Sequence, residues 1–280
     1  MLRSLLLALD GIADHAAALA SALDLAQAAG AGLHIRLTLD RARLEAPEAV
    51  PLGGETFRRH AAETRAARLA ARLDRLAAEI EAALRARGLE GHPARIEGDV
   101  AAEVALEAEA HDLVILSHAL RRPAAQESVD AALALAPAAL VPRCPRPVLL
   151  VDALSLGPGP AVAAYDGSPG SARALHAALL LGLLADRTVH VVTVAASREE
   201  AAEHAGRAAL LLARHGLSAE AHALAGQGGY ADEILAQIDA LDPALVVMGA
   251  FGRRSWRDLL FGAVTDALLE RVTPPVFLAS

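Results

Sequence analysis

The amino-acid sequence predicts an α/β protein with two tandem doubly wound, mainly parallel five-stranded sheets, each flanked by helices. Three observations support this prediction. The strand-like segments are continuous apolar runs, which is typical of parallel strands covered on both faces. These runs alternate with helical patterns. The whole pattern also occurs twice along the 280 residues, which indicates an internal repeat.

The two halves open alike. An apolar run over residues 4–10 opens the first half, and one over 161–166 opens the second; each ends in Asp-Gly. An Ala/Leu-rich helical pattern follows in each half, over about 14–29 and 171–185. Ser168-Pro169 provides a start signal for the second of these helices. Both halves are therefore expected to begin with a strand, a tight turn and a helix.

The later strands also match in pairs. Residues 112–117 parallel 244–249, and 147–151 parallel 275–279. Shorter strands are expected near 94–96 and 220–223, after the second strands over 33–39 and 189–194.

The halves differ in the helix after the second strand. The first half carries a long charged segment and an Arg/Glu-rich helix over 55–87, and the second carries a helix over 199–214. In the longer helix the apolar positions share one stripe: Leu69, Leu73, Leu76, Ile80 and Leu84. Gly157-Pro-Gly-Pro160 marks the boundary between the halves. We therefore expect a first domain over 1–152, a linker over 153–159 and a second domain over 160–280.

Composition excludes several classes of protein. The net charge is −8, all 26 basic residues are Arg, and aromatic residues make up 2% of the chain. An acidic chain with so few aromatic residues lacks the basic surface and the aromatic side chains that nucleic-acid binding requires. No apolar stretch reaches the roughly 20 residues of a membrane span. The single cysteine, Cys144, allows no intrachain disulfide, so a cytoplasmic protein is expected.

Three strand ends of the second half should meet at one edge of the sheet, where doubly wound proteins bind ligands. They are Ala164-Tyr165-Asp166, the segment at Val194, and Met248-Gly249. A glycine-rich loop follows the last of these: Gly249, two residues, Gly252, nine residues, then Gly262 at the start of a helix. Glycines and a helix N-terminus let backbone N–H groups approach an anion. The sequence therefore predicts a phosphate cradle that needs no lysine.

This pattern resembles the universal stress protein family in its tandem form, which implies an adenine nucleotide alpha-hydrolase-like fold. The family's ATP-binding loop has the same three glycines at the same spacing, followed by Ser or Thr. Ala263 stands at that hydroxyl position, and Val264 and Thr265 fit the continuation. The resemblance implies that Asp166 lies near the base and that the Val194 backbone meets the adenine. It also implies ATP, with Mg²⁺, as the ligand.

Departures from the family pattern shape the expectation for each half. Loss of one side-chain hydrogen bond at Ala263 costs about 0.5–1.5 kcal/mol, or roughly twice that if charge-assisted, and Thr265 is near enough in sequence to compensate. The first half reads Ser117-His-Ala-Leu120 at the corresponding place and has no glycine there. We therefore expect the second half to bind ATP and the first half not to bind it in this manner.

Other residues have simpler interpretations beside functional ones. Arg253 either holds a phosphate or belongs to a solvated loop, and Trp256 is expected to pack partly against its own domain. The eleven histidines show no metal-ligand spacing beside a carboxylate or cysteine, so no metal ligands are expected apart from the nucleotide's Mg²⁺. No Ser/His/Asp set can be assembled, so no catalytic residue is expected, and Cys144 is taken as a passive thiol.

Three functions remain open at this point. The leading one is an ATP-binding regulatory or stress-response switch. The second is a nucleotide-independent scaffold or interaction module, and the third is very slow ATP hydrolysis with Asp166 helping to hold a metal. The resemblance also implies dimerisation through last strands. Residues 147–151 and 275–279 could pair within one chain as an intrachain pseudo-dimer, with a homodimer still possible.

Overall fold

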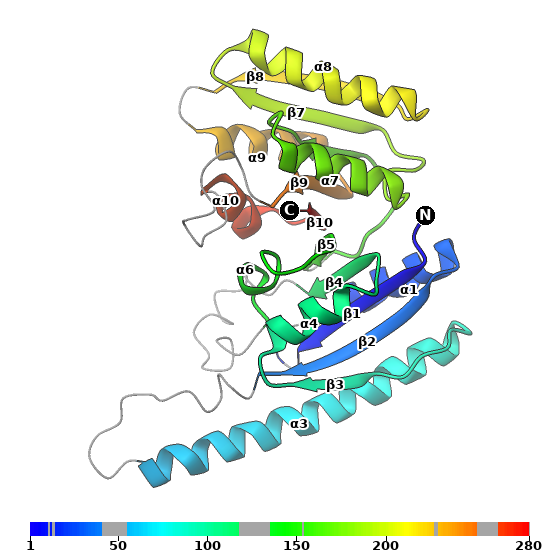
Figure 1. Ribbon diagram of the computed structural model, residues 1–280, viewed down its shortest axis with the longest axis vertical. Helices are drawn as coiled ribbons and strands as arrows, with labels where there is room; N and C mark the ends of the chain where they lie inside the picture. The colour runs from blue at the N-terminus through cyan, green and yellow to red at the C-terminus, as the bar shows by residue number, and fades with distance from the viewer. Residues whose placement is uncertain are drawn as a thin grey trace.

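The computed structural model describes residues 1–10, 12, 15–40, 55–117, 135–152, 154–226, 229–250 and 263–279. Within these residues, ten strands form one continuous sheet that runs the length of the molecule (Figure 1). The strand order is β3-β2-β1-β4-β5-β10-β9-β6-β7-β8. Strands within each half pair in parallel, and the halves join through one antiparallel pair, β5–β10. The predicted fold class is confirmed, and the two five-stranded sheets are fused edge to edge.

The N-terminal half places its first strand between its second and fourth, so the chain switches direction across the sheet beside β1. Its strands are β1 (Ser4–Asp10), β2 (Gly32–Leu39), β3 (Ala94–Glu97), β4 (Leu113–Ser117) and β5 (Val148–Val151). Its helices are α1 (Ala16–Ala29), α3 (Glu55–Ala86), α4 (Val100–Ala108) and the short α6 (Pro137–Leu140).

The C-terminal half repeats this strand order around its own first strand, β6. Its strands are β6 (Ala161–Ala164), β7 (Val189–Ala195), β8 (Ala219–Ala225), β9 (Leu245–Gly249) and β10 (Val276–Ala279). Its helices are α7 (Pro169–Leu180), α8 (Arg198–Arg214), α9 (Tyr230–Leu241) and α10 (Ala263–Arg271). The expected repeat of strand, turn and helix is therefore present in both halves.

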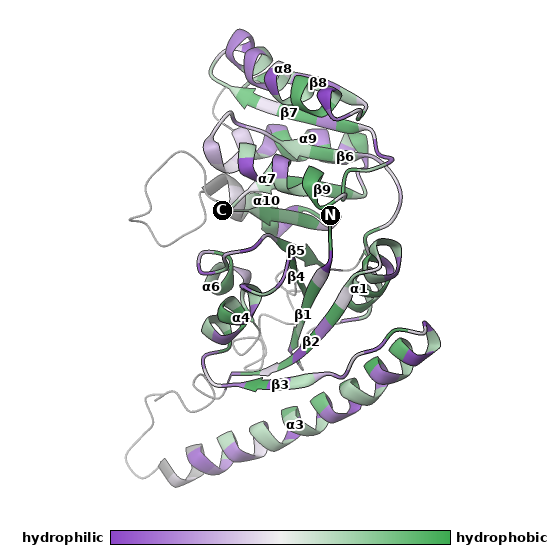
Figure 2. Cartoon of the chain, turned by 45° about the vertical axis from the view of Figure 1, so that its right-hand side comes forward, coloured by the Kyte–Doolittle hydropathy of each residue, from purple (hydrophilic) through white to green (hydrophobic). Residues whose placement is uncertain are grey.

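The core has two layers, one on each face of the sheet. Successive residues of β1 alternate between them: Leu5, Leu7 and Leu9 lie in one layer, and Leu6 and Ala8 in the other. Buried side chains of α1, α3, α7 and α8 complete the first layer, and those of α4, α6, α9 and α10 complete the second. Burial on both faces explains why the strands are continuous apolar runs. Figure 2 shows the hydrophobic residues concentrated along the central strands.

Helix α3 confirms the predicted long amphipathic helix. Leu69, Leu73, Ile80 and Leu84 are buried, and Leu76 is partly buried against the same core layer. Figure 2 shows hydrophilic and hydrophobic residues alternating along α3, and Asp74 of this helix pairs with Arg95 of β3. Helix α3 thus covers the outer part of the N-terminal sheet with its apolar stripe.

Helix α7 begins at the predicted place but ends earlier than expected. Ser168 is its N-cap, and the Ser168 hydroxyl oxygen accepts from the Ser171 N–H at 3.2 Å. At the other end Gly182 adopts a φ of +80°, and the Leu183 N–H returns to the Ala178 carbonyl at 3.0 Å. Glycine adopts this left-handed conformation readily, so it terminates the helical pattern.

The two halves meet through their last strands. Leu149 of β5 lies opposite Phe277 of β10, and the Phe277 side chain is fully buried. The pairing is the intrachain one raised in the sequence analysis, and it leaves neither strand as a free edge. None of the helices that the structure describes is long and apolar enough to cross a lipid bilayer.

The segment between the halves is anchored by side chains. The Arg187 guanidinium donates to the carbonyls of Gly159 at 2.8 Å and Gly157 at 2.6 Å. On the other side, the Leu156 N–H donates to the Ser21 hydroxyl of α1 at 2.8 Å. The connection therefore lies fixed against both halves of the protein.

Candidate functional site

The carboxyl ends of the central C-terminal strands meet at one edge of the sheet. Ala164 ends β6 and lies between Val192 of β7 and Met248 of β9. The next residue, Tyr165, donates its N–H to the Val192 carbonyl at 2.9 Å. Val194 lies two residues beyond Val192 on β7, and Gly249 ends β9. The structure thus brings together the predicted residues Ala164, Tyr165, Asp166, Val194, Met248 and Gly249.

Asp166 forms a tight turn between β6 and α7 and remains exposed. Its carboxylate accepts from the Ser168 N–H at 3.0 Å. Partial burial acts to raise the pKa of Asp166, but hydrogen bonds from Ser168 and Ser171 outweigh it and lower the pKa. Asp166 is therefore an ionised, accessible hydrogen-bond acceptor at neutral pH.

Gly167 completes this turn with a φ of +73°, and a Cβ there would stand 2.3 Å from Nδ1 of His204. Both the backbone conformation and the imidazole of α8 therefore require glycine at this position.

Gly249 lies against the N-terminus of α7. A Cβ on Gly249 would stand 2.8 Å from the Ser171 nitrogen and 2.9 Å from the Gly170 carbonyl carbon. These are backbone atoms of a capped helix, so they cannot move aside as a flexible side chain would. The structure therefore gives Gly249 a packing function that does not depend on any ligand.

A tyrosine that the sequence analysis did not single out lies beside Val194. A Cβ on Gly226 would stand 2.3 Å from the Tyr230 ring and 2.7 Å from Cγ1 of Val194. Tyr230 is the first residue of α9 and is 41% exposed. In the sequence, Tyr230 was marked only by its place directly after two glycines at the start of a helix.

The glycine loop itself lies largely outside the described residues. Gly252, Arg253 and Gly262 belong to 251–262, which the structure does not describe, and so does Trp256. Helix α10 begins at Ala263, directly after Gly262, as the sequence predicted. Val264 is the second residue of this helix, and Thr265 is buried, with 4% of its surface exposed. The structure therefore describes the two ends of the loop, Gly249 and the start of α10.

At the equivalent edge of the N-terminal half, a buried network occupies the corresponding position. The Asp10 carboxylate accepts from the Ile12 N–H at 2.9 Å and from the Leu135 N–H at 3.1 Å. The His15 imidazole contacts the Ser117 hydroxyl at 3.1 Å, and Ser117 ends β4 as Gly249 ends β9. Asp10, His15 and Ser117 are all buried. These polar groups are therefore paired with the protein itself.

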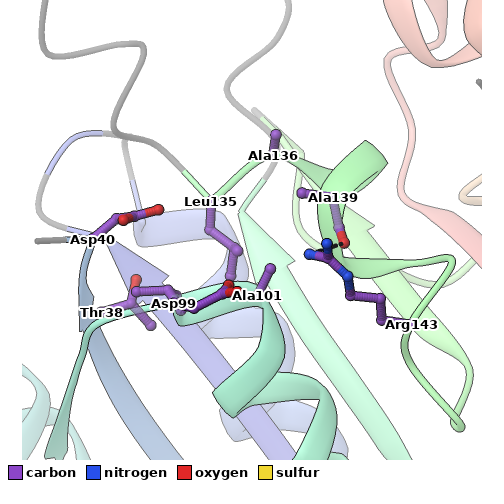
Figure 3. A pocket seen from close by; sticks show the side chains of 9 residues that line it. Thr38, Asp40, Asp99, Ala101, Leu135, Ala136, Ala139 and Arg143 are labelled. Atoms are coloured by element: carbon purple, nitrogen blue, oxygen red, sulfur yellow. Dashed lines mark hydrogen bonds between the residues drawn. The ribbon is translucent and has the colours of Figure 1, made fainter. Parts of the chain in front are cut away.

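A small pocket lies at that edge. Figure 3 shows Leu135 projecting toward Asp99 and Ala101 in a pocket that Thr38, Ala139 and Arg143 also line. Its volume is about 60 Å³. Sites for drug-sized ligands measure about 300–1,000 Å³. Thr38 of β2 lies opposite Asp10 of β1. This pocket is therefore too small for a nucleotide.

The fold and this site define the class of protein: a doubly wound α/β protein with its candidate ligand edge at the strand-order switch of the C-terminal half. Residues 159–280 match the model of the Universal stress protein family. This half of the chain is therefore a domain of that family, and the N-terminal half repeats its strand order.

Solved structures with the same fold span both halves of the chain. A universal stress protein from Archaeoglobus fulgidus DSM 4304 is 16% identical, with 99% of this chain and 96% of that chain covered and a TM-score of 0.70. A functionally unknown protein from Pseudomonas aeruginosa PAO1 is 21% identical, with 99% and 92% covered and a TM-score of 0.60. At these identities the likeness is one of fold. No curated protein matches the sequence.

Proposed function

We propose that the C-terminal domain binds an adenine nucleotide, ATP with Mg²⁺, and acts as a stress-response switch. The observation that carries the proposal is the exposed Asp166 carboxylate at the β6–β9 edge, from which the glycine loop of a universal stress domain departs. An ionised acceptor beside a cradle of backbone N–H groups suits a ligand with a polar base at one end and phosphates at the other.

Each residue of the edge has an assignment under this proposal. Ala164, Tyr165 and Asp166 hold the base and ribose, with the Val194 backbone along the adenine and Tyr230 beside it. Met248 and Gly249 lead into the loop. The phosphates are held by the backbone of Gly252 and Gly262, by Arg253, and by the first turn of α10, which consists of Ala263, Val264 and Thr265. The Thr265 side chain is buried, so it packs inside the domain. The backbone N–H of Ala263 then replaces the hydroxyl that the family pattern has at that position.

The same features favour binding over turnover. A general base works best with a pKa near the operating pH, whereas the pKa of Asp166 is lowered from its ordinary acidic value. Hydrolysis would then depend on a metal held with the nucleotide, and it would be slow. A single-turnover assay with labelled ATP checks this: hydrolysis complete within minutes would contradict a binding switch.

A scaffold function is the second candidate, and the filled N-terminal edge favours it for that half alone. The pocket described at that edge is too small for a nucleotide, and the antiparallel β5–β10 pair supplies the pseudo-dimer within one chain. We place the protein in the cytoplasm, where its free, buried Cys144 stays reduced. A second copy of the chain is not needed for this function.

Isothermal titration of the nucleotide-free chain with ATP and Mg²⁺ tests the proposal. Gly252→Val separates the two candidates, because a branched side chain in the loop blocks phosphate approach. Loss of ATP binding in a variant with an unchanged circular dichroism spectrum supports the switch. Wild-type protein without binding at millimolar ATP supports the scaffold.

A further inference from the structure

Three side chains with metal-ligating atoms meet on the two outermost strands of the C-terminal sheet. His190 comes from β7, and Glu220 and His222 come from β8. Nδ1 of His190 lies 3.0 Å from Nε2 of His222 and 3.4 Å from a carboxylate oxygen of Glu220. The three ligand atoms all lie within 4.8 Å of one another. We call this group the His190 cluster.

The parallel register of β7 and β8 assembles the cluster. His190 lies opposite Glu220, and Val192 lies opposite His222. Because side chains alternate along a strand, Glu220 and His222 share one face, and it is the face of His190. Val192 belongs to the core layer completed by α9, so the cluster lies on that side of the sheet.

The cluster is separate from the proposed nucleotide edge. His190 is near the start of β7, whereas Val194 is near its end. At about 3.3 Å per residue, the Cα atoms of these two residues are roughly 13 Å apart. The two sites can therefore be tested independently.

The donor distances suit a tetrahedral ion. Zn²⁺ binds imidazole nitrogen at about 2.0–2.1 Å and carboxylate oxygen at about 2.0–2.2 Å, which sets neighbouring ligand atoms about 3.3–3.4 Å apart. The separations of His190 from His222 and from Glu220, 3.0 and 3.4 Å, are close to this value. His190 is held in place, with 13% of its side chain exposed, and Glu220 is 60% exposed. A metal would therefore keep one position open to water.

A histidine must be neutral to act as a metal ligand. Burial lowers the pKa of His222, and the neighbouring His190 lowers it further, while Glu220 opposes both effects.

We propose that His190, Glu220 and His222 form a binding site for a divalent first-row transition metal, with Zn²⁺ as the best match. Two imidazoles and one carboxylate are a common ligand set for such ions, whereas Mg²⁺ prefers oxygen ligands alone. The site thus differs in chemistry from the Mg²⁺ that ATP would carry. An open fourth position allows the ion to bind water or a donor group of another molecule.

The N-terminal half offers a matched control. His34 of β2 lies opposite Leu6, and His190 of β7 lies opposite Val162, so the two histidines hold equivalent places beside the first strand of each half. The place of His222 is taken by Ala94, which lies opposite Arg36. His34 instead lies beside His111, with ring centroids 4.7 Å apart. His34→Ala therefore removes an equivalent histidine without touching the His190 cluster.

The test is Zn²⁺ titration of the full, nucleotide-free chain by calorimetry, together with the visible spectrum after Co²⁺ addition. We expect one ion per chain and an intense tetrahedral Co²⁺ spectrum. His222→Ala should remove the site, and Glu220→Gln should weaken binding by about tenfold or more. His34→Ala and Asp166→Asn should leave Zn²⁺ affinity unchanged, which separates this proposal from the nucleotide proposal.

Two results would overturn the site. One is wild-type protein that binds no Zn²⁺, in which case the histidines form only an N–H···N hydrogen bond. The other is Zn²⁺ affinity that survives Glu220→Gln and His222→Ala unchanged. Should His222→Ala fail to fold, the exposed Glu220→Gln variant still decides the question.

Discussion

The Asp10 carboxylate accepts a hydrogen bond from the backbone N–H of Leu135, with 3.1 Å between Oδ2 and the nitrogen. Leu135 follows Asp10 by 125 residues along the chain, so this contact joins two distant segments of the N-terminal half. The equivalent Asp166 accepts from the Ser168 N–H of the adjoining turn, 3.0 Å away, and stays exposed. One half therefore uses its strand-end aspartate to stabilise the fold, and the other keeps it accessible.

Exchanging each aspartate for asparagine should separate these two functions. Asp10→Asn should lower the free energy of unfolding by about 1–3 kcal/mol, because buried N–H groups lose a charged acceptor. It should leave ATP affinity unchanged. Asp166→Asn should weaken ATP binding about tenfold, and it should lower the free energy of unfolding less than Asp10→Asn does. Urea denaturation and ATP titration of both variants check this, and equal loss of ATP affinity in both would count against it.

Acidification should reveal the hydrogen bonds of Asp166. Its folded pKa lies below the ordinary value of 3.8, so its ionised form stabilises the folded state above that pH. This contribution is lost as the pH falls through the folded pKa. The difference in urea midpoint between the wild type and Asp166→Asn should be constant near pH 6 and shrink below about pH 4. If this difference in urea midpoint grew on acidification, the pKa of Asp166 would be raised in the folded state and not lowered.

Gly249→Ala should be costly for a reason unrelated to nucleotide. The new Cβ would stand 2.8 Å from the Ser171 nitrogen, so β9 and α7 must separate. We expect a loss of about 1–3 kcal/mol in the free energy of unfolding, measured by urea denaturation without ligand. Ser117→Ala at the equivalent strand end is the control. It loses a hydrogen bond to His15 but adds no atoms, so it should cost about 0.5–1.5 kcal/mol.

Phe277 should couple the stability of the two halves. Its fully buried side chain lies opposite Leu149 at the only strand pairing that joins the halves in the described sheet. Phe277→Ala should cost about 3–5 kcal/mol and split a single unfolding transition into two. Leu212→Ala, equally buried on α8, should lower stability without splitting the transition. Scanning calorimetry distinguishes one unfolding transition from two. A single transition in Phe277→Ala would show that other contacts couple the halves.

Local patterns in the sequence predicted most of the fold. Continuous apolar runs predicted the parallel strands, the stripe from Leu69 to Leu84 predicted α3, and Ser168-Pro169 predicted the start of α7. Each of these signals lies within a few residues of the structure it specifies. The early end of α7 was missed, because Gly182 stands inside an otherwise unbroken apolar helical pattern.

The features that were not predicted depend on contacts between distant segments. The His190 cluster requires the register of β7 against β8, which sets His190 opposite Glu220 and cannot be derived from their spacing along the chain. The hydrogen bond from Leu135 to Asp10 likewise joins segments that no local pattern connects. Gly249 was predicted as a site residue from its motif, whereas its packing against Ser171 required the position of α7.

The central claim is that one half of the chain binds ATP and the other does not. Isothermal titration of the nucleotide-free protein with ATP and Mg²⁺ tests it most directly, because the stoichiometry counts the competent halves. We predict one ATP per chain in the wild type and in Asp10→Asn, with affinity reduced in Asp166→Asn. Two ATP per chain, or no binding at millimolar ATP, would contradict it.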